Sequence, residues 1–300
     1  MPDKKQIEFI EDRLLVRAPA KINLSLLIAG KRPDGFHEIE TLMAKVNLYD
    51  ELLLEQSSTG RIELVCKGSH SAPCGPENLV YKACEVLLDR AGMRPQIKVT
   101  LTKNIPVGAG LGGGSSDAAA ALIGLNKFMK TSFSRQELAE MASELGSDVA
   151  FFIGGPLAYC TGRGEKTRKI ENKYPFLAVL ILPDINVSTK RVYANYTHNK
   201  NIYEPFKATI EENLKKNNVD LIAQMCTNML ENSCFLLHPG LQQLKTTVEK
   251  LGVAPVCLSG SGSAMFSIVK NVDYQRAKEC KVRLNGLAGC ETVLVNNSVW

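Results

Sequence analysis

The chain has 300 residues, of which 45% are hydrophobic and 22% charged, values typical of a folded globular protein that is long enough for two domains. Its formal net charge of +5 suits an anionic small-molecule substrate and is too small to indicate nucleic acid as a partner. No apolar run reaches the roughly 18 residues of a membrane helix, and the charged N-terminus lacks the apolar stretch of a signal peptide. The sequence therefore predicts a cytoplasmic protein with no membrane partner.

The first predicted elements are β-strands. Residues 14–29 predict two strands interrupted at Pro19, because apolar residues alternate on both sides of that position. Lys21 and Asn23 lie two residues apart on one face of this apolar run, where a charged lysine needs either a path to water or a buried partner. The dozen or so residues before Leu14 predict a tail that is either disordered or extends a strand.

A turn-rich segment follows at residues 30–37, with Pro-Asp-Gly at its centre. Strands are predicted over 38–54 and 61–66, where β character and alternation return. The apolar spacing of residues 78–91 is helical, and Gly92 is a typical stop signal after it.

The most informative stretch is the glycine-rich segment 106–117, which follows a predicted strand at 97–101. Five glycines within seven residues allow left-handed backbone conformations and a close approach to a ligand. The two serines and Asp117 are predicted to cap a helix whose interior is 118–125. Because a helix N-terminus presents unpaired N–H groups and a positive dipole, the segment predicts a phosphate-binding loop.

Other interpretations of the glycine segment fit less well. No Gly-Lys-Ser/Thr closes it, as a P-loop requires. A dinucleotide-binding turn would need an acidic residue at a strand end about 20 residues further on, and Glu137 and Glu140 lie instead in a predicted helix. A purely structural turn between strand and helix remains the other alternative.

The next predicted helix begins at Ser134, which forms a capping box with Glu137, and ends near Gly146. Asp148 then opens an apolar stretch and could serve as a helix N-cap. Residues 157–182 predict β structure. No long linker marks a boundary, and we place one loosely between an N-terminal domain of residues 1–160 and a C-terminal domain of residues 161–300.

The C-terminal half predicts a mixed α+β arrangement with helices on one face of a sheet. Helices are predicted over 206–216, 219–231, 239–251 and about 272–284, a hairpin over 256–258 and 264–269, and a strand over 291–296.

The nine cysteines are odd in number, include no C-x-x-C pair and match no zinc-binding spacing. We therefore expect reduced and mostly buried thiols. A metal site built from histidine and cysteine is not expected.

Three separated stretches resemble the three motifs of the GHMP kinases, the family of galactokinase, homoserine kinase, mevalonate kinase and phosphomevalonate kinase. They are Pro19-Ala-Lys-Ile-Asn-Leu24, the loop from Pro106 to Ser116, and Leu258-Ser-Gly-Ser-Gly-Ser-Ala264. The segments Arg32-Pro-Asp-Gly-Phe-His37 and Gly146-Ser-Asp148-Val resemble the branch of that family that phosphorylates 4-(cytidine 5′-diphospho)-2-C-methyl-D-erythritol. The likeness covers nearly the whole chain from about residue 14 onward.

The resemblance implies an α+β, two-domain GHMP kinase fold, with an N-terminal domain like domain 2 of ribosomal protein S5 and a ferredoxin-like C-terminal domain. It implies transfer of the γ-phosphate of ATP to the 2-hydroxyl of the methylerythritol unit, a step in the non-mevalonate route to isoprenoid precursors. Mg²⁺ is expected with ATP; its ligand is unknown, with Ser116 as a guess. Relatives of this kind are monomers or homodimers.

The resemblance also assigns roles to individual residues. Asp148 matches the catalytic aspartate that acts as general base, and Lys21 the lysine that orients it and holds it ionised. The residues assigned to ATP are Pro106, Val107, Gly108, Ala109, Gly110, Leu111, Gly112, Gly113, Gly114, Ser115 and Ser116, with Asn78 and Lys103 near the adenine. The residues assigned to the substrate are Asn23, Phe36, His37 and Tyr193.

Within the substrate set, His37 matches the histidine that reads the cytosine edge, and Phe36 and Tyr193 match the aromatic residues on its two faces. Many relatives carry tyrosine at the Phe36 position, and phenylalanine keeps the stacking surface without the hydroxyl.

Two alternatives to this function remain. The chain could be another GHMP kinase, acting on homoserine, mevalonate or a sugar, although an aromatic beside a histidine suits a nucleotide-tagged substrate better. It could also be a non-catalytic nucleotide sensor, although the presence of both Lys21 and Asp148 argues against that.

Overall fold

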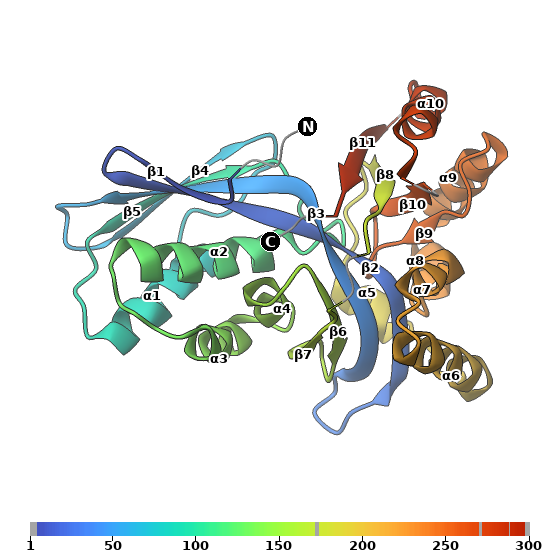
Figure 1. The fold of residues 1–300 in the computed structure, drawn as a ribbon, viewed down its shortest axis with the longest axis horizontal. Coiled ribbons are helices and arrows are strands. Elements are labelled where there is room, and N and C mark those ends of the chain that lie inside the picture. The colour runs from blue at the N-terminus through green and yellow to red at the C-terminus, as the bar shows by residue number, and fades with distance from the viewer. Residues whose placement is uncertain (1–4, 172–173, 270–271, 288, 298–300) are drawn as a thin grey trace.

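The computed structural model describes residues 5–171, 174–269, 272–287 and 289–297, and these form an α+β structure with two sheets (Figure 1). The first sheet contains β1 (Ile7–Ile10), β2 (Arg13–Lys31), β3 (His37–Gln56), β4 (Ile62–Gly68), β5 (Ile97–Lys103), β6 (Leu157–Thr161) and β7 (Lys166–Lys169). Its order is β1-β2-β3-β5-β4, with β6 paired to β3 and β7 paired to β6. The second sheet, of order β11-β8-β10-β9, contains β8 (Leu177–Pro183), β9 (Cys257–Leu258), β10 (Met265–Val269) and β11 (Cys290–Asn296).

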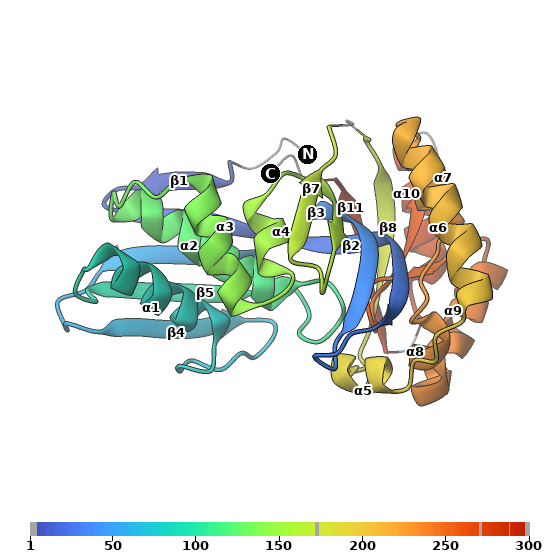
Figure 2. The ribbon, with the colours of Figure 1, turned by 90° about the horizontal axis from the view of Figure 1, so that it is seen from below.

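Helices cover one face of the first sheet (Figure 2). They are α1 (Leu79–Ala91), α2 (Gly113–Phe128), α3 (Arg135–Leu145) and α4 (Val149–Ile153). The alanine-rich interior of α2 packs directly on β2 and β3, because small side chains allow close approach. The predicted capping box of Ser134 and Glu137 at the start of α3 is confirmed.

The remaining helices belong to the C-terminal half. They are α5 (Thr189–Ala194), α6 (Lys200–Lys215), α7 (Val219–Met225), α8 (Glu231–Leu237), α9 (Pro239–Lys250) and α10 (Tyr274–Leu284). Helices α6 and α7 lie against β2, and α10 lies against β8 and β11. The predicted hairpin of 256–258 and 264–269 is confirmed as the antiparallel pair β9 and β10.

Strand β2 is a single element of 19 residues, so the prediction of two strands separated at Pro19 was wrong. Proline lacks the N–H that a ladder needs, but the strand absorbs it as an irregularity. The pairing of β2 with β3 shifts its register between Pro19 and Ala20 and then continues.

The two long strands β2 and β3 run from one half of the molecule to the other (Figure 1). On the first half they pack against α2. Further along, Ala20 and Ile22 of β2 share a core with Leu180 of β8 and with Phe176, which directly precedes β8. The boundary predicted at residue 160 remains a prediction, and the chain passes from the first sheet to the second between Lys169 and Leu177.

Helix α2 begins at Gly113, five residues earlier than the sequence predicts. Gly112 is the N-cap residue, in the left-handed conformation with φ of 69°, and no side chain caps the helix. The prediction that the two serines and Asp117 cap it was therefore wrong. All three lie inside its first turns, and the N–H groups of the helix start are left without a side-chain acceptor.

The helix predicted over 219–231 ends at Met225, before Cys226 with its φ of 53°, and the next helix, α8, begins only at Glu231; neither α5 nor α8 was predicted. Cys226 and Cys257 form a disulfide, so the expectation of nine reduced thiols was wrong for this pair. Of the N-terminal tail, Ile7–Ile10 extends the sheet by pairing with β2, and residues 1–4 lie outside the described part.

Candidate active site

A cleft of about 1110 Å³ lies between the glycine-rich loop, the long strands β2 and β3, the loop before α1 and helix α5. Every residue that the sequence assigns to ATP, substrate or catalysis lines this cleft except Ser116. Ser116 is fully buried, and its Oγ has no hydrogen-bond partner among the described residues. The cleft thus brings together residues from positions 21 to 261 of the chain.

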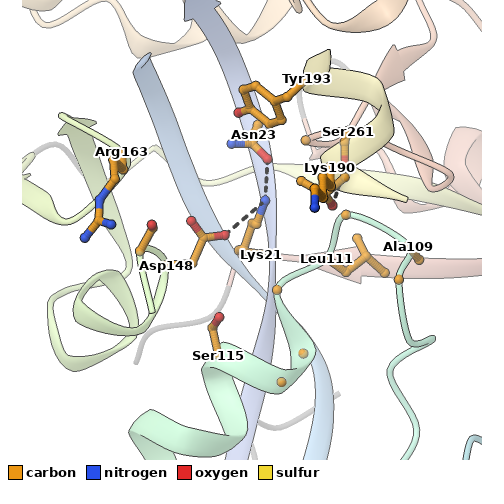
Figure 3. Close-up of a pocket in the computed structure, with 18 of the residues that line it drawn as sticks. Lys21, Asn23, Ala109, Leu111, Ser115, Asp148, Arg163, Lys190, Tyr193 and Ser261 are labelled. Atoms are coloured by element: carbon orange, nitrogen blue, oxygen red, sulfur yellow. Dashed lines mark hydrogen bonds and ion pairs between the residues drawn. The ribbon is translucent and has the colours of Figure 1, made fainter. Parts of the chain in front are cut away.

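The centre of the cleft holds Lys21, Asn23 and Asp148. The Nζ atom of Lys21 lies 3.7 Å from Oδ2 of Asp148 and donates a hydrogen bond of 2.5 Å to Oδ1 of Asn23. Figure 3 shows Lys21 between these two side chains, with Ser115 on one side and Tyr193 on the other. Asp148 is the N-cap residue of α4, yet its side chain makes no capping hydrogen bond. Its carboxylate is therefore available to the cleft and to Lys21.

A chain of hydrogen bonds fixes this centre from behind. Asn23 donates through Nδ2 to Oγ1 of Thr41 at 2.8 Å, and Thr41 donates to the carbonyl of Ser25 at 2.6 Å. Burial lowers the pKa of Lys21, and the nearby charge of Asp148 opposes that shift. Thr41 was missed by sequence reasoning, because a threonine in a strand gives no sign of which side chain it will support.

The glycine-rich loop is pinned by its carbonyl groups. Lys21 donates its N–H to the carbonyl of Leu111, Ala264 donates to Ala109, and the hydroxyl of Ser259 donates to Gly110. Gly110 has a φ of 77°, and a Cβ added there would lie 2.1 Å from the carbonyl oxygen of Ser259. Only glycine fits this contact. The loop therefore turns its carbonyls toward the protein and leaves the uncapped start of α2 facing the cleft, an arrangement that fits an anionic phosphate.

One end of the cleft is aromatic. The ring of His37 lies 5.3 Å from that of Tyr193 and 5.8 Å from that of Tyr196. Phe36 is 52% exposed, and the guanidinium of Arg163 lies 5.0 Å from its ring. Burial, with the charges of Lys31 and His198, lowers the pKa of His37, which favours the neutral imidazole. Tyr196 and Arg163 were missed, because neither lies in a motif.

The two residues predicted near the adenine are held by the protein itself. Lys103 pairs with Asp50 and, at 2.7 Å, with Asp117. Asn78 caps α1 by accepting from the N–H of Val80 and donates to the carbonyl of Pro73. Contact of either residue with a base stays a prediction.

The Lys103 pairs form a buried charged cluster under the glycine-rich loop. Burial raises the pKa of Asp117, whose Oδ1 has no hydrogen-bond partner among the described residues. Burial also opposes the charge on Lys103, but Asp117 and Asp50 outweigh it and raise the pKa of Lys103. Asp50 was missed, because an acid followed by Glu51 within a strand reveals nothing of the lysine that it will pair with.

Within the described residues, no group of three or more histidine, cysteine, aspartate or glutamate side chains could hold a metal ion. Over the same residues, no helix is long and apolar enough to cross a membrane.

Comparisons with known proteins place these features in a family context. Residues 78–156 match the family described as GHMP kinases N terminal domain, and residues 210–285 match GHMP kinases C terminal. A 4-diphosphocytidyl-2-C-methyl-D-erythritol kinase from Bacillus cytotoxicus is 39% identical over 94% of this chain and 95% of its own length. One from Listeria innocua is 40% identical over 94% of both chains.

Solved structures give the same picture. A crystal structure of a 4-(cytidine 5′-diphospho)-2C-methyl-D-erythritol kinase superposes with a TM-score of 0.74 at 32% identity, covering 95% of this chain and all of that one. A homoserine kinase from Cytophaga hutchinsonii superposes with a TM-score of 0.76 at 19% identity, covering 99% of this chain and 98% of that one. The second likeness concerns the fold alone.

Proposed function

The chain belongs to the 4-diphosphocytidyl-2-C-methyl-D-erythritol kinases of the GHMP kinase family, and from this premise we propose how its cleft performs the reaction of that family. The protein is an ATP-dependent small-molecule kinase with the GHMP kinase fold. It phosphorylates the 2-hydroxyl of 4-(cytidine 5′-diphospho)-2-C-methyl-D-erythritol on the non-mevalonate route to isoprenoid precursors.

The observation that carries the mechanism is the pair of Lys21 and Asp148 facing the start of α2 across the cleft. Phosphoryl transfer needs the acceptor hydroxyl in line with the moving group and a base to take its proton. Asp148 would accept that proton through its carboxylate. Lys21 would hold the carboxylate ionised and offset the negative charge that develops beside it.

The glycine-rich loop would hold the phosphates of ATP. The uncapped N-terminus of α2 supports this assignment, since it offers N–H groups and the positive end of the helix dipole. Bound Mg²⁺ would neutralise phosphate oxygens, which provide most of its ligands together with water. Ser116 is the one side chain suggested as a protein ligand; its hydroxyl has no hydrogen-bond partner among the described residues, but it does not line the cleft.

The aromatic end of the cleft would hold the cytidine. A neutral imidazole offers one donor and one acceptor, which suits the polar edge of cytosine. Phe36 and Tyr193 would lie against the faces of the base, as the resemblance implies, and Asn23 would keep Lys21 in place from behind.

A coupled assay of ADP release with a panel of acceptors tests the function. We expect turnover with the cytidine-linked methylerythritol and little with homoserine, mevalonate or sugars. Turnover with one of those instead would indicate another GHMP kinase, and tight ATP binding with no turnover on any acceptor would indicate a nucleotide sensor. We expect the enzyme to act in the cytoplasm as a monomer or homodimer, which fractionation and size-exclusion chromatography would test.

A further inference from the structure

Lys45 is a fully buried lysine that the mechanism above does not use. It lies on β3 directly opposite Lys21 of β2, so both side chains project from the same face of the sheet. Its Nζ donates two hydrogen bonds of 2.9 Å, one to the carbonyl of Phe152 and one to the carbonyl of Gly154. The ammonium also lies 5.5 Å from the ring centre of Phe151. Lys45 is thus bound at the end of α4.

These carbonyls form the C-terminal end of α4, where backbone acceptors lack partners within the helix and the dipole is negative. Arg135 reaches the same end from the outside, donating to the carbonyl of Ile153 at 2.8 Å and to that of Gly154 at 3.3 Å. Two basic side chains therefore bind three successive carbonyls. Burial, with the charge of Arg135, lowers the pKa of Lys45. If the side chain loses its proton, its neutral amine still has two N–H groups and can donate to the carbonyls of Phe152 and Gly154.

The opposite end of α4 carries Asp148 as its N-cap residue. The helix has five residues, so its two ends are only about 7 Å apart at the usual rise per residue. The helix is also held through Phe152, whose ring packs against Gly112 of the glycine-rich loop. The contact is so close that a Cβ added to Gly112 would lie 3.0 Å from the Phe152 ring and 3.0 Å from Lys21. A displacement of the C-terminal end would therefore be transmitted to the carboxylate of Asp148.

We propose that Lys45 is a positioning residue for phosphoryl transfer: by binding the C-terminal carbonyls of α4, it fixes the place of Asp148 relative to Lys21. The inference rests on the proposed role of Asp148 as general base. Lys45 touches neither substrate in this scheme, and its removal should affect the chemical step more than binding, because a misplacement of about 1 Å is costly for a reacting group.

The main test is Lys45→Met, which keeps the volume and removes the donors. We expect kcat to fall about 10- to 100-fold while KM for ATP and for the acceptor changes less than about twofold. Hydrogen exchange should accelerate in residues 148–154 and stay unchanged in β5 and α1. Arg135→Met, a change at an exposed residue, should give a smaller loss of kcat with faster exchange in the same segment.

The matched control is Lys245→Met, which removes a partly buried lysine bound to Glu231 in the C-terminal half. It should change neither kcat nor exchange in residues 148–154. Unchanged kcat in Lys45→Met would overturn the inference. So would a fall in kcat accompanied by raised KM values and faster exchange throughout the chain, which would indicate a general structural role.

A double variant separates this inference from the proposed function. If Asp148→Asn lowers kcat to a measurable residual rate, adding Lys45→Met should cause no further loss of that rate, because the positioned group is already gone. A further loss as large as that of Lys45→Met alone would contradict the positioning role. If Asp148→Asn keeps normal turnover, the proposed function of Asp148 fails, whatever Lys45→Met does.

Discussion

Asp148 is the single residue whose substitution should affect catalysis most. Asp148→Asn keeps the shape of the side chain and removes the base, so we expect kcat to fall by roughly 10²–10⁴ while ATP affinity stays nearly the same. Steady-state kinetics and calorimetry with ATP would measure both quantities. Asp12→Asn, an exposed acid in the turn before β2, is the control and should leave kcat unchanged. Normal turnover of Asp148→Asn would remove the residue from the mechanism.

His37 should determine binding of the cytidylyl group. We expect His37→Ala to raise KM for the cytidine-linked substrate at least tenfold more than KM for ATP, because the loss leaves polar base edges unpaired. The comparison variant is His238→Ala, at the junction of α8 and α9. Equal effects of His37→Ala on both KM values would contradict the assignment.

The pH dependence of substrate binding follows from the same residue. Burial lowers the pKa of His37 from its ordinary value of 6.5, so the neutral form, which we propose to be the one that binds cytosine, persists to more acidic pH than for a free histidine. KM for the cytidine-linked substrate should therefore be constant near neutral pH and rise only as the pH falls through that lowered pKa. A KM that instead rises toward alkaline pH would show that the imidazolium is the binding form.

Single residues were predictable from sequence where a motif carried them. Lys21, Asp148 and the glycines lie in short, ordered patterns, and all of them line one cleft. Thr41 and Asp50 were not predictable, because their roles arise from neighbours brought together by folding. Lys45 shows the limit most clearly: its sequence context is a strand, and its partners lie more than a hundred residues away.

At the scale of elements, the glycine-rich loop is the part most sensitive to an added methyl group. Gly110→Ala would place a Cβ against the carbonyl of Ser259 in a left-handed conformation, so we expect a loss of more than about 1 kcal/mol of stability and weaker ATP binding. Urea unfolding and calorimetry would measure these effects.

The control for Gly110→Ala is Gly240→Ala in α9, where nothing lies within 4 Å of the added Cβ. That change should stabilise the protein by about 0.5–1 kcal/mol, since alanine favours the helix. If Gly110→Ala lowers stability no more than a glycine-to-alanine change at an exposed loop position does, the close contact with the carbonyl of Ser259 would be contradicted.

Element types were largely predictable, whereas their ends were not. Alternation predicted the strands, and helical spacing with Gly92 predicted α1. The errors arose where tertiary packing overruled local preference: β2 passes through Pro19, and α2 begins at Gly113, where an added Cβ would lie 3.1 Å from Ile105 and 3.2 Å from Lys103. The helix predicted over 219–231 ends early, at Met225, and the left-handed residue after it, Cys226, forms a disulfide with Cys257.

At the scale of the whole molecule, one cluster joins the two halves. Glu40 of β3 accepts hydrogen bonds from Tyr159 of β6 and from Tyr203 and Lys207 of α6, at 2.9–3.0 Å. We expect Glu40→Ala to lower the free energy of unfolding by about 2 kcal/mol, because the loss leaves partly buried donors without their charged acceptor. Urea unfolding would measure the change.

Glu212→Ala is the matched control for Glu40→Ala. Glu212 pairs with Lys216 on the same helix, but both side chains are more than 60% exposed, so no measurable change is expected. Equal effects of the two substitutions would show that Glu40 does not hold the halves together.

The continuity of β2 and β3 has a consequence for how such enzymes could be recombined. Both strands precede the glycine-rich loop in the chain, yet their distal stretches supply part of the wall on which the C-terminal sheet rests. In a hybrid that joins the first 160 residues of one kinase to the remainder of another, β2 and β3 would come from one parent and the sheet that packs against them from the other. Compatibility between parents is therefore decided by the facing side chains of residues 20–28 and 39–46, far upstream of any cut.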